Sequence, residues 1–449
     1  MRLLKAFFNK TTLPIIFLTS LLLSTLSTAN EQQKLTIYGS NTIGSQLGPA
    51  LAQSFLQSQG YANIKLHSSP DAHQHTITAG ANPTQPSVRI DIHTQGSSTG
   101  FTALHNQTGD IAAASRPIKE QEISLLSPFS EMQSKHSEHI IAIDGIAIIV
   151  HKDNPISALS ITQLAAVFSG ELDNWQALGG RPGAINIYAR DNNSGTWETF
   201  KTLVLSVAGK TLSTTAKRFE SSTALSDSVS NDLNGIGFIG LPYVRKAKAL
   251  AVSAQDAVSM HPSKELIATE DYPLSRRLFF YSSAQNNSPL TQAFLAFTHS
   301  SSGQMQVEKN GFISQVVSAM SVPTADSMPI RYQQLSQQAQ RLSVNFRFKE
   351  GSAQLDNKAQ RDIDRVLTYL RSHNKTQKKL VLVGFGDTKS DPQRALLLSK
   401  LRAMAVRRQL RRDDIIFREV FGIGDAMPVA SNHIDQGRLK NRRVELWVY

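Results

Sequence analysis

The sequence contains no cysteine among its 449 residues. This absence excludes disulfide bonds, thiolate metal sites, cysteine nucleophiles and a lipid-modified N-terminal cysteine. Long hydrophobic runs are also scarce, because no segment after residue 26 is apolar enough to span a bilayer. The mature protein is therefore predicted to be soluble, with cores held together by noncovalent packing alone. Its length allows two to four domains, each large enough to bury a core of its own.

The N-terminus has the pattern of a secretory signal peptide, predicted over residues 1–29. Three basic residues precede an apolar run over residues 13–26, and small residues stand before Asn30. A retained membrane anchor is the alternative, but the run is short and interrupted by serines and threonines. The sequence thus predicts export to the periplasm or cell envelope of a Gram-negative bacterium. This location is compatible with outer-membrane association.

The positive charge is concentrated at one end of the chain. Residues 341–449 hold 23 Lys and Arg against 12 Asp and Glu, whereas residues 30–340 hold 21 against 23. A basic domain of this kind suits a polyanionic partner. Because the protein is predicted to be exported, an anionic envelope polymer is expected and nucleic acid is not.

One stretch, residues 185–204, has the features of an anion site. Apolar residues alternate at its start, as in a half-buried strand, and recur at helical spacing at its end. A helix that begins after a polar turn has unpaired backbone N–H groups, which together with a guanidinium and hydroxyls attract anions. The alternative is an ordinary capped helix with a solvated arginine. The turn contains Arg190, Ser194, Gly195 and Thr196.

Similar strand–turn–helix units recur earlier in the chain, again with hydroxyl residues where a helix begins. Several such turns on one α/β chain indicate a ligand held by backbone N–H and hydroxyl groups. We expect two α/β lobes over residues 30–320, with crossings near 140–148 and 240–252 and the ligand in the cleft between them. The hydroxyls of these earlier turns belong to Ser40, Thr42, Ser97, Ser98 and Ser115.

Five motifs, spread over residues 34–315, together resemble the phosphate-binding periplasmic proteins of ABC transport, the PstS family. The resemblance implies a type II two-lobed binding protein with no catalysis and no cofactor, with inorganic phosphate or a similar oxyanion as ligand and an ABC importer as candidate partner. The motifs are Gly39-Ser40-x-Thr42, Gly96-Ser97-Ser98-Thr99-Gly100, Gly109-Asp110-Ile111-Ala112-x-Ala114-Ser115-Arg116-Pro117, Arg190-x-x-x-Ser194-Gly195-Thr196 and Gly237-Phe238-Ile239-Gly240. By this resemblance, the oxyanion is lined by Ser40, Thr42, Ser97, Ser98, Ser115, Arg190, Ser194, Gly195 and Thr196.

One departure bears on selectivity, because some family members place a carboxylate where Ser115 stands. Such a carboxylate accepts the proton of monohydrogen phosphate and repels fully ionised sulfate. A serine hydroxyl can also donate to sulfate, so selectivity for phosphate is left open. Asp191 is expected to orient Arg190; the alternative is that it supplies the missing acceptor. His93 and His151 have no spaced partners and are expected to be structural, not metal ligands.

The chain then passes through a predicted linker, residues 321–340, into a C-terminal domain over residues 341–449. Alternating apolar residues predict strands near 344–348, 380–384 and 444–448, and helical spacing predicts helices between them. The order indicates a small βαβ-type α+β sandwich.

This last domain resembles the OmpA C-terminal peptidoglycan-binding family over nearly its full length. The carriers are Gly384-Phe385-Gly386-Asp387, Leu398-Ser399-x-x-Arg402-Ala403, Gly422-x-Gly424-Asp425-x-x-Pro428-Val429-Ala430-x-Asn432 and Gly437-Arg438-x-x-Asn441-Arg442-Arg443-Val444-Glu445. The resemblance implies that Asp387 pairs with the ammonium of diaminopimelate in the wall peptide and Arg402 with its carboxylate. The alternative is an ion pair that only joins a loop to a helix. Two positions depart from the family, Ala395 and Gly386.

These expectations describe a binding protein tethered to peptidoglycan, and not an enzyme. Two other hypotheses stay open. The first domain would be a structural or adhesive module if its cleft had lost its ligand. It would be a phosphatase if it hydrolysed phosphate esters, although the sequence has no clustered metal ligands and no nucleophile elbow.

Overall fold

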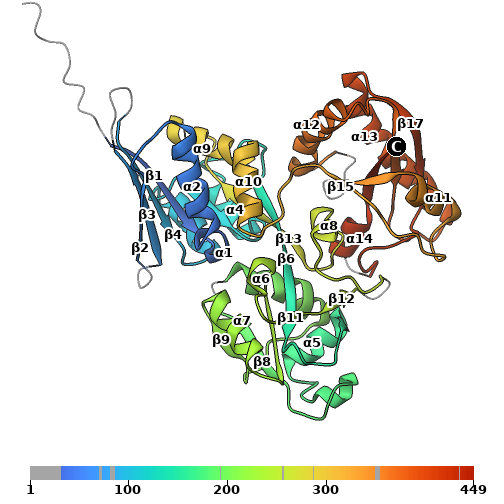
Figure 1. Cartoon of the computed structure of the whole chain (residues 1–449), viewed down its shortest axis with the longest axis horizontal. Coiled ribbons are helices and arrows are strands. Elements are labelled where there is room, and N and C mark those ends of the chain that lie inside the picture. Colours follow the sequence, from blue (N-terminus) through green and yellow to red (C-terminus); the bar gives the residue numbers. More distant parts are fainter. Residues whose placement is uncertain are drawn as a thin grey trace, which may run out of the picture.

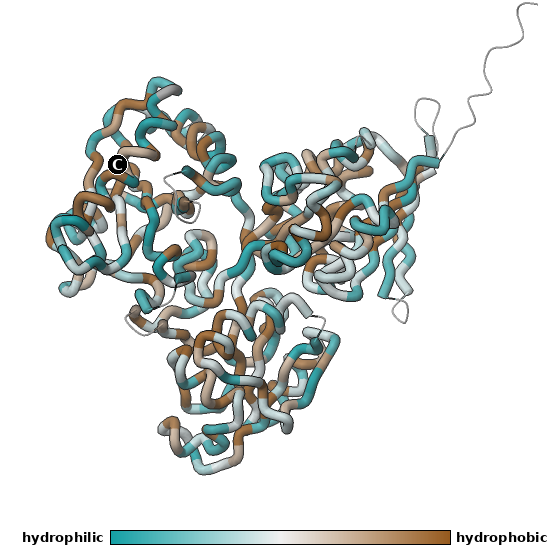
Figure 2. The backbone as a smooth tube through the Cα atoms, turned by 180° about the vertical axis from the view of Figure 1, so that it is seen from behind, coloured by the Kyte–Doolittle hydropathy of each residue, from teal (hydrophilic) through white to brown (hydrophobic). Residues whose placement is uncertain are grey.

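The computed structural model describes residues 32–69, 73–80, 86–192, 194–254, 257–286, 288–348, 354–433 and 435–449. The predicted signal peptide lies outside these residues. Three bodies meet at the centre of the molecule (Figure 1). We call them lobe 1 (residues 32–140 and 278–315), lobe 2 (residues 145–274) and the C-terminal domain (residues 319–449). Each contains its own hydrophobic segments (Figure 2).

Lobe 1 is built on parallel pairing of β1 with β4 and β5. Two outer strands extend this sheet: β3 pairs antiparallel with β4, and β2 pairs antiparallel with β3. Apolar residues at helical spacing on α2 (Leu47–Ser58) face the sheet and the last two helices of the lobe, which buries Leu51 and Phe55. Its strands are β1 (Gln33–Gly39), β2 (Lys65–Ser69), β3 (Gln74–Ala79), β4 (Val88–His93) and β5 (Ile111–Ala114). The other helices are α1 (Asn41–Gly44), α3 (Ser97–His105), α4 (Glu120–Leu126), α9 (Pro289–His299) and α10 (Ser301–Lys309).

In lobe 2, the strand and helix expected within residues 185–204 form β8 (Asn186–Arg190) and α6 (Gly195–Phe200). Parallel strands β10 (Gly235–Gly240), β8 and β9 (Lys217–Phe219) form its sheet. The stacked rings of Phe200 and Phe238, 4.0 Å apart, fix α6 on this sheet. The other elements are β7 (Ala158–Ser160), α5 (Ile161–Ser169), α7 (Ser222–Ser230), β11 (Lys248–Ala249), β12 (Ala251–Ser253) and α8 (Lys264–Ala268).

Two antiparallel strands connect the lobes, β6 (Glu138–Val150) and β13 (Ser275–Tyr281). On the lobe 1 side β13 pairs with β5, and on the lobe 2 side β6 pairs with β10, so one sheet runs through both lobes. The crossing predicted near 140–148 is β6. The second crossing, predicted near 240–252, was placed wrongly: β11 pairs with the end of β6 and stays in lobe 2, and the chain returns through β13.

The C-terminal domain is an α+β sandwich whose sheet has the order β14-β15-β18-β16-β17. Helices α12 and α13 pack on one face of this sheet and α11 on the other. The segment expected as a linker, residues 321–340, contains the whole of α11, where Tyr332 and Leu335 are buried in one cluster with Trp447 and Phe385 of the domain. The elements are β14 (Ala319–Met320), α11 (Ile330–Gln338), β15 (Gln340–Arg347), α12 (Asn357–Ser372), β16 (Gln377–Gly384), α13 (Pro392–Leu410), β17 (Ile416–Gly422), α14 (Asp435–Asn441) and β18 (Arg443–Val448).

The α/β class with a separate small sandwich agrees with the prediction from the sequence. Among the described residues, no helix combines the length and the apolar character needed to cross a membrane.

Candidate functional site

Hydroxyl side chains from four separate turns of lobe 1 and lobe 2 meet in the cleft between the lobes. The Ser40 hydroxyl donates to that of Ser115 over 3.1 Å, and the Ser97 hydroxyl accepts the backbone N–H of Ser115 over 3.2 Å. Opposite them lies the start of α6, where the hydroxyls of Thr42 and Thr196 are 3.2 Å apart across the cleft. All five side chains are at most 3% exposed. Sequence positions up to 156 residues apart thus form one small, dry, polar site.

Ser194 serves partly as the cap that the simpler interpretation predicted. Its hydroxyl accepts the backbone N–H groups of Thr196 and Trp197, at 3.2 and 3.4 Å. It is nevertheless buried beside the cleft, at 4% exposure. The cap therefore fixes the turn that presents the next two residues to lobe 1.

Gly195, at the start of α6, lies directly against the hydroxyls of lobe 1. A Cβ atom at this position would stand 2.0 Å from the Ser115 hydroxyl and 2.7 Å from that of Ser97. Both distances are far below van der Waals contact, so a side chain here would hold the lobes apart.

Ser98, by contrast, does not join this cluster. It is exposed, and its hydroxyl accepts from Arg116 over 3.0 Å. Consecutive positions on a helix point about 100° apart, so Ser97 and Ser98 at the start of α3 cannot both face the cleft.

Arg190 is buried, but lobe 2 itself supplies the groups that hold it. Its guanidinium donates to the carbonyls of Phe219 (3.1 Å) and Glu220 (2.5 Å) and to the Ser222 hydroxyl (2.5 Å). Burial lowers the pKa of Arg190 to about 10, while the charge of Asp191 raises it, so the group stays cationic at neutral pH. No hydrogen bond between Asp191 and Arg190 is present. The orienting role expected of Asp191 is taken by residues 219–222.

A second arginine near Arg190 was not selected from the sequence as a site residue. Arg276 forms a buried ion pair with Asp144, with N–O distances of 3.0 and 2.7 Å, and one of its terminal nitrogens has no hydrogen-bond partner. Its charge is close enough to lower the pKa of Arg190. Asp144 and Arg276 stand opposite each other on β6 and β13. The signals in the sequence were a lone acid in the apolar β6 segment and the segment Tyr272-Pro273-Leu274-Ser275-Arg276, which also looks like the PstS family.

The structure shows the cleft closed. Besides the threonine contact, the Ser45 hydroxyl of lobe 1 lies 3.0 Å from that of Tyr243 in lobe 2. The ammonium of Lys119 and the carboxylate of Glu198 form an ion pair of 2.8 Å across the same gap. Closure excludes water from the hydroxyl cluster, which strengthens polar interactions inside it.

A second site lies in the C-terminal domain, around Asp387 just after β16. One oxygen of this carboxylate accepts from Lys389 and Arg442, each over 2.8 Å. The other oxygen is buried without a hydrogen-bond partner and faces Arg402 of α13 at 3.9 Å. Burial alone would raise the pKa of Asp387, but the bonds from Arg442 and Lys389 outweigh it and lower the pKa well below its usual range.

This geometry leaves room for a cation and an anion side by side. The unpartnered oxygen of Asp387 can accept from an ammonium, and Arg402 can donate to an adjacent carboxylate. Lys389 and Arg442 were not selected for this site from the sequence, where Arg442 was considered only for additional anion contacts.

His93 and His151 lie apart from one another, and His93 stacks on Tyr38 with ring centres 4.1 Å apart. Across the described ranges no group of three or more histidine and acidic side chains is placed to hold a metal ion.

Comparison with known proteins identifies both parts of the chain. Residues 72–302 match a family model described as a PBP superfamily domain, and residues 347–442 match the OmpA family. The chain belongs to the PBP superfamily, with a PstS-like binding-protein domain followed by an OmpA-family domain.

Two relatives carry the name phosphate-binding protein PstS. The protein of Pseudomonas aeruginosa is 31% identical over 51% of this chain and 75% of its own length. That of Borreliella burgdorferi is 28% identical over 52% of this chain and 82% of its own length. Among solved structures is a putative phosphate ABC transporter substrate-binding protein from Clostridium perfringens with bound phosphate. It is 26% identical to this chain, with a TM-score of 0.50. The match covers 63% of this chain and 99% of that one.

Proposed function

We propose that this protein captures inorganic phosphate between its two lobes and is held on peptidoglycan by its C-terminal domain. The role is retention of phosphate in the cell envelope, close to the wall. Delivery to an ABC importer remains compatible with this role if the importer reaches the tethered protein.

The observation that carries the proposal is the convergence of buried hydroxyls and one buried guanidinium in a closed cleft. Ser40, Thr42, Ser97 and Ser115 can donate to, and accept from, a tetrahedral oxyanion, and Arg190 supplies a positive charge nearby. The names of the Borreliella burgdorferi and Pseudomonas aeruginosa relatives, and the phosphate bound in the Clostridium perfringens structure, support phosphate over other oxyanions.

The first experiment is calorimetric titration of phosphate, then sulfate, into the signal-free protein. We expect saturable phosphate binding, with Trp197 fluorescence changing in parallel because this side chain lies within α6. Sulfate binding of similar strength would show that Ser115 does not discriminate as a carboxylate would.

Two neighbouring serines provide a matched pair of variants. Ser97→Ala removes a buried hydroxyl of the cluster and should weaken phosphate binding about tenfold, the effect of one lost hydrogen bond to a charged ligand. Ser98→Ala removes an exposed hydroxyl on the same helix and should leave the affinity unchanged. Arg190→Ala should abolish binding, but it also removes three bonds within lobe 2, so its folding must be checked by circular dichroism. If the wild-type protein binds neither phosphate nor sulfate in these titrations, the proposal of phosphate capture is refuted.

The tether is tested by sedimentation with purified peptidoglycan. Arg402→Ala should remove co-sedimentation, because the wall-peptide carboxylate loses its donor. Arg408→Ala, an exposed change on the same helix, is the control for overall charge. Co-sedimentation that survives both Arg402→Ala and Asp387→Ala would rule out this site.

A further inference from the structure

The C-terminal domain is docked on the segment that joins the lobes, through buried polar contacts. Arg341 of β15 donates to the carboxylate of Asp271 over 2.6 Å. Asn345, on the same strand, donates to Asp271 and to the carbonyl of Thr269, each over 2.9 Å. Burial raises the pKa of Asp271, but Arg341 and two further arginines outweigh it, so the pKa is lowered and the carboxylate is ionised.

A second group of contacts continues along the chain into β13. Arg347 donates to the carbonyls of Thr269 and Glu270, each over 3.1 Å. Arg277 pairs with Asp356, which caps α12, over 2.9 Å. Buried charges separated from their partners cost several kcal/mol each, so this surface is stable only while it is covered.

The same domain is also hydrogen-bonded to lobe 1, through α12. Asn357 donates to the carbonyl of Gln133 (2.9 Å) and to the carboxylate of Glu138 (3.0 Å). Arg361, one turn later, donates to the carbonyls of Glu138 (3.1 Å) and Lys135 (2.8 Å). The C-terminal domain therefore contacts both lobes, on either side of the strands that connect them (Figure 1).

Bridging both lobes has a mechanical consequence. Opening the cleft requires the lobes to rotate about β6 and β13. Since the C-terminal domain is bonded to both lobes in the closed arrangement, rotation must break one of its two sets of contacts. Docking thus stabilises the closed, anion-binding conformation.

Three consecutive residues connect this docking surface to the wall-binding site. Lys440 donates to the carbonyl of Pro273 in lobe 2 over 2.7 Å. Asn441, fully buried, accepts the N–H groups of Val429 and Ala430 at 2.9 and 3.0 Å. Arg442 then bonds Asp387. The end of α14 and the residue after it therefore join lobe 2 to Asp387 through consecutive contacts.

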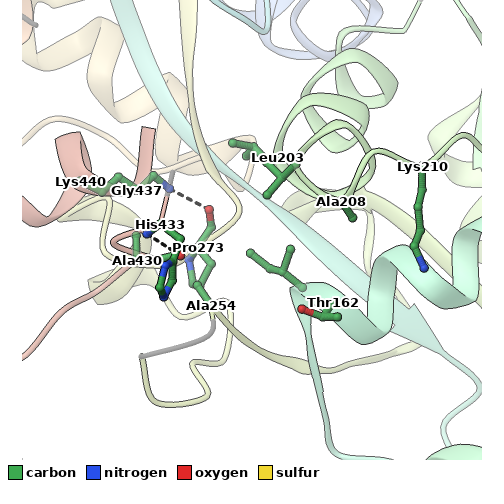
Figure 3. A pocket seen from close by; sticks show the side chains of 13 residues that line it. Thr162, Leu203, Ala208, Lys210, Ala254, Pro273, Ala430, His433, Gly437 and Lys440 are labelled. Carbon is green, nitrogen blue, oxygen red and sulfur yellow. Dashed lines mark hydrogen bonds between the residues drawn. The ribbon is translucent and has the colours of Figure 1, made fainter. Parts of the chain in front are cut away.

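The loop held by Asn441 touches lobe 2 as well. Val429 packs into the hydrophobic core of lobe 2. Next to it, a cavity of about 410 Å³ lies between the C-terminal domain and lobe 2 (Figure 3). The C-terminal domain lines it with Ala430, His433 and Lys440, and lobe 2 lines it with Thr162, Leu203 and Lys210. The space gives the loop freedom to shift when lobe 2 moves.

We propose that wall-peptide binding and anion binding are energetically linked, because the docked C-terminal domain fixes the closed lobes and shares α14 with the wall site. A diaminopimelate peptide that binds Asp387 and Arg402 stabilises the docked arrangement and so raises the affinity of the cleft for its anion. This linkage rests on the proposed phosphate and wall-binding functions and adds regulation of one by the other.

The test is titration of phosphate into the full-length mature protein with and without a soluble muropeptide that contains diaminopimelate. We expect the peptide to lower the phosphate Kd by about fivefold, and phosphate to lower the peptide Kd by the same factor, because coupling is reciprocal. Unchanged or weaker phosphate affinity, with both ligands bound, would overturn the linkage.

A variant of the lobe 1 contact isolates the cause. Asn357→Ala combined with Arg361→Ala should remove the coupling while each ligand still binds, since neither residue lies in a binding site. Arg371→Ala, exposed at the end of the same helix, should keep the coupling. Coupling that survives in the double variant would show that docking on lobe 1 is not its route.

A structural readout separates failure of the linkage from failure of phosphate binding. Because the chain has no cysteine, spin labels can be placed at Gln57→Cys in lobe 1 and Leu233→Cys in lobe 2, both exposed. The muropeptide alone should narrow the distance distribution between these labels toward the closed state. An unchanged distribution with bound peptide would overturn the linkage whether or not the cleft binds phosphate.

Discussion

Gly195 lies against hydroxyls contributed by two different turns of lobe 1, those of Ser97 and Ser115. Its lack of a side chain, and not an unusual backbone angle, is what the position requires, since a Cβ atom would overlap the Ser115 hydroxyl. The residue therefore sets how far the cleft can close.

At this position, Gly195→Ala is expected to weaken phosphate binding by at least about tenfold, because the lobes can no longer reach the closed geometry that excludes water. The free energy of unfolding should change little, since the added methyl group points into the cleft and not into a core. Calorimetry with phosphate and a thermal melt without it check both parts. Normal phosphate affinity in this variant would mean that the bound state is more open than this structure.

The surroundings of Ser115 and Arg190 decide what each side chain can offer to the cleft. Ser115 lies at the end of a buried strand and meets two other hydroxyls, so its donors and acceptors are available inside the site. Arg190 is positioned by two carbonyls and a hydroxyl of lobe 2, which fixes its charge beside the cleft.

The short helix α14 ends between lobe 2 and the site around Asp387. Its last two residues bond lobe 2 and the loop at Val429. Arg442 follows and pairs with Asp387, and Arg443, the first residue of β18, pairs with Glu445. Burial, with Arg347 nearby, lowers the pKa of Lys440 to about 7.

This shift gives a pH-dependent prediction for α14. Between pH 7 and about 10.4 the unfolded chain holds a proton on Lys440 that the folded chain lacks, so the free energy of unfolding rises with pH through this range. Lys440→Met should remove about 1 kcal/mol or more of that rise. Urea denaturation at pH 7 and pH 9.5 measures it. Lys400→Met, an exposed change on α13, is the control. If the free energy of unfolding rises equally with pH in the wild-type protein and both variants, Lys440 keeps a normal pKa.

At the scale of the whole molecule, three bodies share one polar junction. One hydrophobic cluster continues from lobe 1 into lobe 2, and Val429 of the C-terminal domain packs into the core of lobe 2. Charges of β13 and β15 also pair across the boundaries, Arg277 with Asp356 and Arg341 with Asp271. The molecule should therefore behave as one cooperative unit and not as a binding protein on a flexible tether.

Acid should weaken this assembly. His139 of β6 and His299 of α9 lie beside Arg361 and Arg365 of α12, with ring centres of the two histidines 5.7 Å apart. Burial, strengthened by these arginines, lowers the pKa of His139 to about 4 and that of His299 to about 2. Both are neutral in the folded protein, so the stability they contribute is complete above pH 6.5 and is lost as the pH falls through 4 toward 2.

The double variant His139→Gln, His299→Gln should flatten the fall in stability between pH 6.5 and 4.5. The expected difference is about 2 kcal/mol at most for each histidine at pH 5. Denaturation midpoints at pH 7.5, 6 and 5 provide the measurement, and His373→Gln, exposed directly after α12, is the control. If the stability of the double variant falls with pH as steeply as that of the wild-type protein, the two histidine rings are not buried in the neutral state.

Local patterns in the sequence were enough to place the strands and helices that carry the site. Alternating apolar residues at 185–188 predict β8, and apolar residues at helical spacing after residue 196 predict α6. The spacing of apolar residues in the sequence follows the side of the strand or helix that is buried. The hydroxyl turns could be selected for the same reason, since each lies where a strand ends and a helix begins. Asp387 and Arg402 were found through resemblance, and the structure brings them within 3.9 Å.

What the sequence by itself determined is the class of each part: an α/β binding protein, a basic α+β sandwich, no cysteine chemistry, and a set of hydroxyl turns. Only the tertiary structure decided which of two adjacent serines faces the cleft, what holds Arg190, where the chain returns to lobe 1, and that the C-terminal domain rests on both lobes. These outcomes depend on contacts between side chains 70 or more residues apart, such as Arg341 with Asp271 and Ser40 with Ser115. Which distant charges pair with each other cannot be predicted from the spacing of residue types in a single sequence.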